Sequence, residues 1–208
     1  MTSSTRSLVR RAALAVPAVT AALVLAACGS GEDSAGGART SSPAASAERT
    51  AGAHNDADVS FAQGTIPHHQ QAVRMARTAA TRASSAEVKD LASRIEKAQD
   101  PEIETMSGWL ESWGAKVPST MPGMDHSGHG DMPGMMDGQD MNELAKASGA
   151  DFDRMFLTMM VEHHEGAVEM ATTEKANGRY APARKTADDI ITAQNAEIEE
   201  MNKLLGKS

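Results

Sequence analysis

The chain has 208 residues, a length that suits one domain or two, and its formal net charge is −8. Its single cysteine excludes an intramolecular disulfide framework and cysteine-rich zinc or iron–sulfur sites. Leu, Ile, Val and Phe number only 29, about 14% of the chain against the roughly 20% of packable sequences, whereas Met reaches 14. We therefore expect either extensive disorder or a core built on Ala and Met.

Residues 1–27 are typical of a bacterial lipoprotein signal peptide. Three arginines and no acid accompany an apolar run over 12–27, which is short for a membrane span but suits a signal core. The run ends in LAAC and so resembles a lipobox, which predicts lipidation of Cys28 and a mature chain held on the extracytoplasmic face of the cell membrane. The alternative is an ordinary signal with a chance cysteine. Residues 28–53, rich in Gly, Ser, Ala and Thr, are predicted to be a disordered tether behind the lipidated cysteine.

The predicted mature chain is strongly acidic. Removal of the signal leaves 17 basic and 28 acidic residues, a net charge of −11. Because the chain has no basic cluster, we expect no binding to nucleic acid.

Residues 54–113 and 141–208 are two copies of one unit. At a constant offset of 95, 19 of the 54 positions in 58–111 are identical to those in 153–206. The copies are rich in good helix formers, and apolar residues recur at spacings of three and four. Each copy is therefore predicted to be a helical hairpin, and the pair an all-α four-helix bundle.

The helix ends can be placed by their capping residues. Asp56 or Asp58 is expected to cap the first helix, and Asp151 or Asp153 the third. Gly178 is expected to end the third helix in the left-handed conformation.

Histidine and methionine recur together at helical spacing in both copies. Each His-His pair is followed by a methionine seven residues after its first histidine, which places the two on one helix face. Imidazole suits Cu(I) and Cu(II), and thioether suits Cu(I). The candidate metal ligands or ligand-orienting residues of the repeats are His68, His69, Met75, Gln99, Glu102, Met106, Met159, Met160, His163, His164, Met170, Gln194, Glu197 and Met201. The alternative for the methionines is core packing, because Met is an adaptable filler, and the two glutamates could simply be solvated.

Residues 114–140 differ in composition from both copies. Pro and Gly oppose regular structure here, and the sequence MPGM occurs twice. Because a disordered methionine-rich loop has no core to fill, we predict a soft trap for copper, and for silver by the same chemistry. The alternative is a flexible linker of biased composition. The candidate ligands in this loop are Met121, Met124, His126, His129, Met132, Met135 and Met136.

The segments IPHHQQAVRMA and VEHHEGAVEMA, the paired QxxEIExM segments and the MPGM loop resemble the bacterial family called "domain of unknown function 305" over about residues 54–208. The resemblance implies a ferritin-like four-helix bundle. Since some members are periplasmic or secreted copper-binding proteins, it also implies a metal role for His68, His69, His163, His164, Met75 and Met170.

These features together predict a membrane-anchored protein that sequesters copper or passes it to a copper-handling partner, without catalysis. Metal binding or self-association is expected to add to the stability of a thin core. One alternative is an envelope stress or interaction protein whose His and Met are incidental. Another is a ferritin-like di-iron oxidase, but that class needs Glu-x-x-His motifs, which the sequence lacks.

Overall fold

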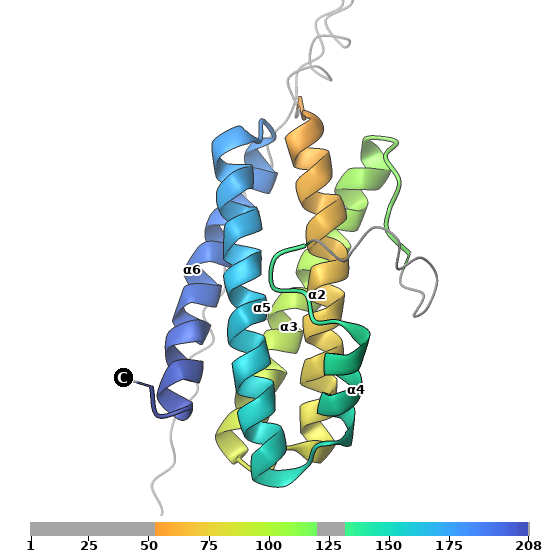
Figure 1. Ribbon diagram of the computed structural model, residues 1–208. Helices are drawn as coiled ribbons and strands as arrows, with labels where there is room; N and C mark the ends of the chain where they lie inside the picture. The colour runs from red at the N-terminus through yellow and green to blue at the C-terminus, as the bar shows by residue number, and fades with distance from the viewer. Residues whose placement is uncertain (1–52, 120–131, 208) are drawn as a thin grey trace, which may run out of the picture. The chain divides into compact units, whose positions relative to one another are not determined.

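The computed structural model describes residues 53–119 and 132–207. Over these residues the chain forms α-helices and no β-strand (Figure 1). The described helices are α2 (Asp56–Arg82), α3 (Ala86–Ser112), α4 (Gly138–Lys146), α5 (Gly149–Asn177) and α6 (Ala181–Leu204). The prediction of an all-α bundle made of two repeated hairpins is confirmed, with α2 and α3 as the first hairpin and α5 and α6 as the second.

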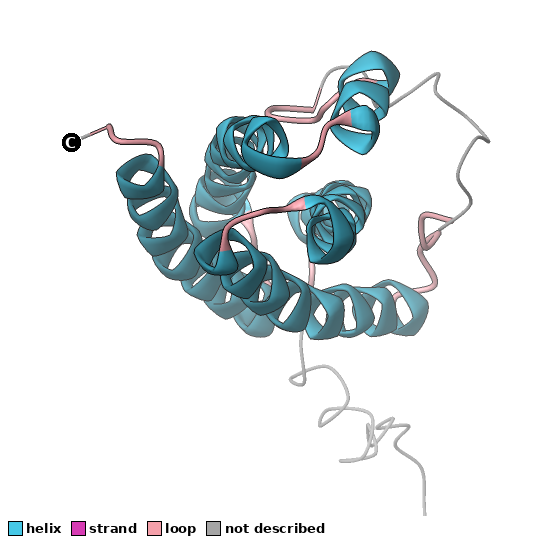
Figure 2. Cartoon of the chain, turned by 90° about the horizontal axis from the view of Figure 1, so that it is seen from below, coloured by secondary structure: helices cyan, strands magenta, loops and turns pink. Residues whose placement is uncertain are grey.

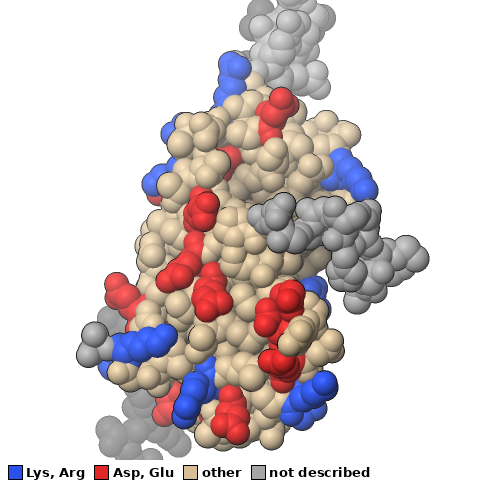
Figure 3. Space-filling model, viewed as in Figure 1, with Lys and Arg blue, Asp and Glu red and all other residues tan. Residues whose placement is uncertain are grey.

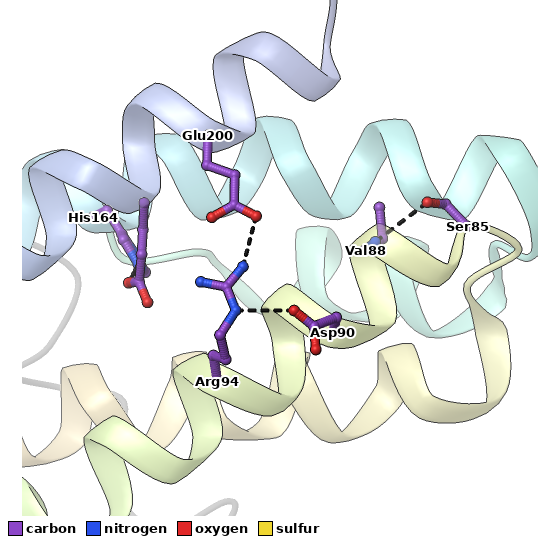
Figure 4. A network of polar contacts seen from close by, with 7 residues as sticks. Ser85, Val88, Asp90, Arg94, His164 and Glu200 are labelled. Atoms are coloured by element: carbon purple, nitrogen blue, oxygen red, sulfur yellow. Dashed lines mark hydrogen bonds and ion pairs between the residues drawn. The ribbon is translucent and has the colours of Figure 1, made fainter.

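The two hairpins meet mainly through their first helices, α2 and α5 (Figures 1 and 2). The second helices are joined at the surface by Arg94, which binds Glu200 across the bundle at 2.6 Å and Asp90 on its own helix at 3.0 Å (Figure 4). Because Arg94 is 44% exposed, this network contributes little to stability. The buried contact of α2 with α5 therefore holds the hairpins together.

Helix α4 was not predicted, and it begins inside the segment assigned to the loop. Asp137 is its N-cap and accepts hydrogen bonds from the backbone of Gln139 and Asp140, while the Asp140 side chain completes a capping box. Leu144 anchors the short helix in the core at 1% exposure. The helix was not predicted because the glycine- and proline-rich composition before Asp137 indicated a loop that extends to residue 140.

The predicted caps of α2 and α5 are wrong. Asn55 is the N-cap of α2, and Asp58 lies at N3 of its capping box. Ser148 precedes α5 and makes no side-chain capping hydrogen bond with the described chain. Gly178 ends α5 in an extended conformation with φ −66° rather than in the left-handed region.

Asp153 binds the turn of the opposite hairpin instead of capping its own helix. Its carboxylate accepts hydrogen bonds from the backbone N–H groups of Ser84 at 3.0 Å and Ser85 at 2.9 Å, and from the Ser84 hydroxyl. These contacts fix the α2–α3 turn, where Ser85 also caps α3 by accepting from the Val88 N–H (Figure 4). The first copy therefore depends on the second for the geometry of its turn.

Asp58, 95 residues before Asp153, makes the matching contact. It accepts hydrogen bonds from the backbone N–H groups of Arg179 at 3.0 Å and Tyr180 at 2.9 Å, in the α5–α6 turn. The two donors lie 95 residues after Ser84 and Ser85. The internal repeat thus preserves a reciprocal lock between the hairpins.

Glu174 breaks this symmetry, since the first copy has Ala79 at its position. The Glu174 carboxyl is 1% exposed and lies against Asp58. Burial, followed by the hydrogen bond and negative charge of Asp58, raises the pKa of Glu174 to about 8. Burial would also raise the pKa of Asp58, but the hydrogen bond from Glu174 and those from backbone N–H groups outweigh it and lower that pKa. Glu174 is therefore expected to be protonated at neutral pH, beside an ionised Asp58.

Stability is expected to fall with rising pH because of Glu174. Its folded-state pKa of about 8 exceeds the ordinary value of 4.5, so its contribution is fully present below pH 4.5 and is lost as pH rises through 8. Glu174→Gln should remove this slope, which reaches about 1.4 kcal/mol per pH unit. Urea unfolding at pH 5, 6.5 and 8 measures it, with exposed Glu169→Gln as control. If the free energy of unfolding depends on pH in the same way in Glu174→Gln and in the wild type, the raised pKa of Glu174 is contradicted.

The core consists of two apolar clusters at different levels of the bundle. The first core cluster lies near the α2–α3 turn, and its large members include Met75, Leu91, Ile95, Phe152, Phe156, Met160 and Met201. The second core cluster lies near the α5–α6 turn, and its large members are Phe61, Ile66, Met106, Leu110 and Ile190. Alanine and methionine fill much of both, as the composition predicted.

Within residues 53–119 and 132–207, none of the helices is both long and apolar enough to cross a bilayer.

Candidate metal centre

A layer of buried polar side chains separates the two core clusters. Each long helix passes from one cluster to the other at this layer, so all four helices contribute to it. Its members are at most 3% exposed and are His68, His69, Gln71, Gln99, His163, His164 and Gln194. The sequence-predicted histidines and glutamines of the repeats are therefore brought together at one level.

The second histidine of each pair binds a glutamate of its own hairpin. His69 Nε2 lies 2.8 Å from a carboxylate oxygen of Glu102, and His164 Nε2 lies 2.8 Å from one of Glu197 (His164 is labelled in Figure 4). Both imidazoles are fully buried, whereas the glutamates are 26% and 15% exposed. Each carboxylate fixes the orientation of its ring and leaves Nδ1 as the free nitrogen.

The first histidines of the pairs face each other at the centre of the layer. The ring centroids of His68 and His163 are 3.7 Å apart, with a 38° angle between the rings. His68 Nε2 lies 3.0 Å from the carbonyl oxygen of Pro133, and its Nδ1 has no partner among the described residues. Neither ring nitrogen of His163 has a hydrogen-bond partner in the described chain.

The electrostatics of this pair favour neutral imidazoles. Burial, together with the proximity of His69 and His164, lowers the pKa of His68 to about 3. Burial and the neighbouring imidazoles of His68, His164 and His69 lower the pKa of His163 well below its ordinary value. A neutral imidazole with an unpaired nitrogen is the form that binds a metal.

The methionines of the repeats lie on both sides of the layer. Met75, Met106, Met160 and Met201 are fully buried, and Met159 is 8% exposed, so all five also fill the core as the packing interpretation proposed. Met170 is partly buried and packs against the second core cluster. Thioether sulfurs are thus present above and below the imidazoles.

Residues 132–136, which we call the strap, lie across the His68–His163 pair. The Gln71 side chain donates to the Met136 carbonyl and accepts from its N–H, both at 2.8 Å. The strap passes so close to α5 that a Cβ on Gly166 would lie 2.0 Å from the Pro133 carbonyl oxygen. Gly134 adopts φ +73° with its Cα near the backbone of residues 162–163, where a side chain would clash.

The strap corrects one expectation about the methionine-rich segment. Met136 packs against the first core cluster, so the expectation that these methionines have no core to fill is wrong for this residue. Sequence reasoning also missed Gln71 and Pro133, whose roles depend on tertiary contacts. The candidate residues outside the described residues are Cys28, Met121, Met124, His126 and His129.

Across residues 53–119 and 132–207, no three His, Cys, Asp or Glu side chains gather as a metal-holding group. The candidate donors are the buried imidazole nitrogens of the layer and the thioether sulfurs of the clusters on either side of it, residue types that suit copper in its soft Cu(I) state.

Comparison with known proteins identifies the family of this helical bundle. The model of the family "Domain of unknown function (DUF305)" matches residues 58–205, and the chain belongs to this family. A crystal structure of a putative secreted DUF305 protein from Streptomyces coelicolor is 34% identical with a TM-score of 0.65, covering 73% of this chain and 93% of that chain.

Structures of the protein CopM are similar as well. CopM in its Cu(II)-bound form is 39% identical with a TM-score of 0.62, covering 72% of this chain and 95% of CopM. Its Cu(I)-bound form gives 36% identity and a TM-score of 0.58, covering 71% and 94% of the two chains. A comparison with curated proteins finds no match.

Proposed function

We propose that the protein binds copper and sequesters or transfers it outside the cytoplasmic membrane. The observation that carries this proposal is the buried pair of neutral imidazoles, His68 and His163, with unpartnered nitrogens between two methionine-containing clusters. Leaving these nitrogens unpaired costs about 1–3 kcal/mol each, and a bound soft metal would satisfy them. The copper-bound forms of CopM support the same assignment.

The proposed role is binding rather than catalysis. Copper is the cargo, and the chain lacks the Glu-x-x-His motifs of di-iron oxidases. Acidic side chains are spread over the face of the bundle in Figure 3, and the net charge of −8 attracts cations to the surface. We propose release to a copper-handling partner or a second copy as the next step.

A competition titration tests copper binding directly. The purified full chain should take Cu(I) from a chromophoric chelator, and the replacement His163→Leu should weaken this binding. His54→Leu is the matched control, because His54 is exposed and stacks on Trp113 away from the layer. Failure of the wild type to take Cu(I) would overturn the proposal.

We also propose that a lipid on Cys28 holds the protein at the membrane, on the basis of the signal-like residues 1–27. Replacing Cys28 with Ser should move the protein from the membrane fraction to the soluble extracytoplasmic fraction and abolish labelling with a radioactive fatty acid. Unchanged labelling and fractionation of the variant would refute lipidation at this residue.

A further inference from the structure

Two thioethers converge over a glycine on α2. A Cβ built on Gly64 would lie 3.7 Å from the Sδ atom of Met170 and 3.8 Å from that of Met132. Met170 belongs to α5 and Met132 to the strap, so the two sulfurs come from separate parts of the chain. Gly64 leaves the space between them free of its own side chain.

The internal repeat gives this arrangement a counterpart. At the offset of 95, Gly64 corresponds to Met159, and Met170 corresponds to Met75. Met75 and Met159 both lie in the first core cluster. The second copy therefore has a methionine, Met159, at the position where the first copy has Gly64. Beside Gly64, a sulfur is provided instead by Met132 of the strap.

The position of the sulfurs connects the surface with the imidazole pair. Gly64 lies one helical turn before His68, on the same face of α2. Pro133, the residue after Met132, lies against the His68 ring through its carbonyl oxygen. Gly64, Met132 and Met170 are partly exposed, whereas Met75 and its neighbours in the core are fully buried. Met132 and Met170 are therefore closer to solvent than the fully buried imidazoles of His68 and His163.

We propose that Met132 and Met170 form an entry site for a soft monovalent cation, Cu(I) or Ag(I), beside the His68–His163 pair. This proposal rests on the proposed copper function and adds where the ion first binds. Two neutral thioethers favour soft monovalent ions and give little affinity for hard divalent ions such as Mg²⁺ or Ca²⁺. Because the strap supplies one sulfur, the site also couples metal binding to the segment that covers the imidazoles.

The test is a titration with Ag(I), which is diamagnetic, of the full chain labelled with ¹³C at the methionine methyl groups. The first equivalent should shift the methyl signals of Met132 and Met170, assigned from the Met132→Leu and Met170→Leu variants. Each variant should weaken the binding of this equivalent by about tenfold. Met155→Leu is the control, because Met155 is partly buried against the first core cluster.

Gly64 provides a second variant that leaves both sulfurs in place. Gly64→Ala places a Cβ at ordinary contact distance from them and should bind Ag(I) like the wild type. Gly64→Leu should fill the space and abolish the shifts. If the wild type binds Ag(I) while the Met132 and Met170 methyl signals stay unmoved, the entry site is refuted and the proposed function stands. If the wild type binds neither Ag(I) nor Cu(I), both fail.

Discussion

Replacing His163 with Leu should stabilise the metal-free protein and remove most of its stabilisation by copper. The imidazole is fully buried, and its two nitrogens have no hydrogen-bond partners among the described residues. A buried polar atom without a partner costs about 1–3 kcal/mol, which an apolar side chain of similar size avoids. We therefore expect His163 to lower the stability of the metal-free protein while it provides a ligand for the metal.

Thermal unfolding with and without Cu(I) measures both effects. A domain of this size shifts its melting temperature by about 2–4 °C per kcal/mol. Copper at 100 times its dissociation constant should stabilise the wild type by about 2.7 kcal/mol and the variant much less. The control His54→Leu should keep the full copper response. A His163→Leu protein that is less stable and still responds fully to copper would contradict this role of the imidazole.

Replacing Asp153 with Ala should destabilise the bundle by about 2–4 kcal/mol. The carboxylate accepts three hydrogen bonds from Ser84 and Ser85, and its loss would leave two backbone N–H groups at the α2–α3 turn without their acceptor. Hydrogen bonds to charged groups contribute about 1.5–3 kcal/mol each, although water can replace part of them at a turn.

Asp151→Ala is the matched control for this effect. Asp151 is exposed in the first turn of the same helix, so its loss should cost less than about 1 kcal/mol. Urea unfolding of the two variants compares them. Equal destabilisation by both substitutions would mean that Asp153 acts only through helix α5 and does not lock the opposite hairpin.

The fold was predictable because the repeat is strong. Identical residues at a constant offset of 95 predict two similar units, and the 3.6-residue pattern predicts helices. The repeat also carries the matching contacts His69–Glu102 and His164–Glu197, since both partners recur at the same spacing. The four histidines of the polar layer, with Gln99 and Gln194, could therefore be proposed from the sequence alone, whereas Gln71 could not.

The strap and the turn locks were not predictable from local pattern. The strap is held by Gln71 and by its close approach to Gly166, so its structure comes from tertiary contacts that its own composition does not encode. Asp58 and Asp153 have the residue type and position of helix caps, but their carboxylates satisfy distant backbone groups instead. Sequence rules for capping consider only neighbours along the chain.

X-ray absorption by the Cu(I)-loaded full chain tests the proposed copper site most directly. Copper held near the imidazole pair and the surrounding methionines should have a first shell of both nitrogen and sulfur, with nitrogen reduced in a His68→Leu, His163→Leu double variant. A shell of oxygen alone, or a nitrogen and sulfur shell unchanged in that variant, would contradict binding at the centre of the bundle.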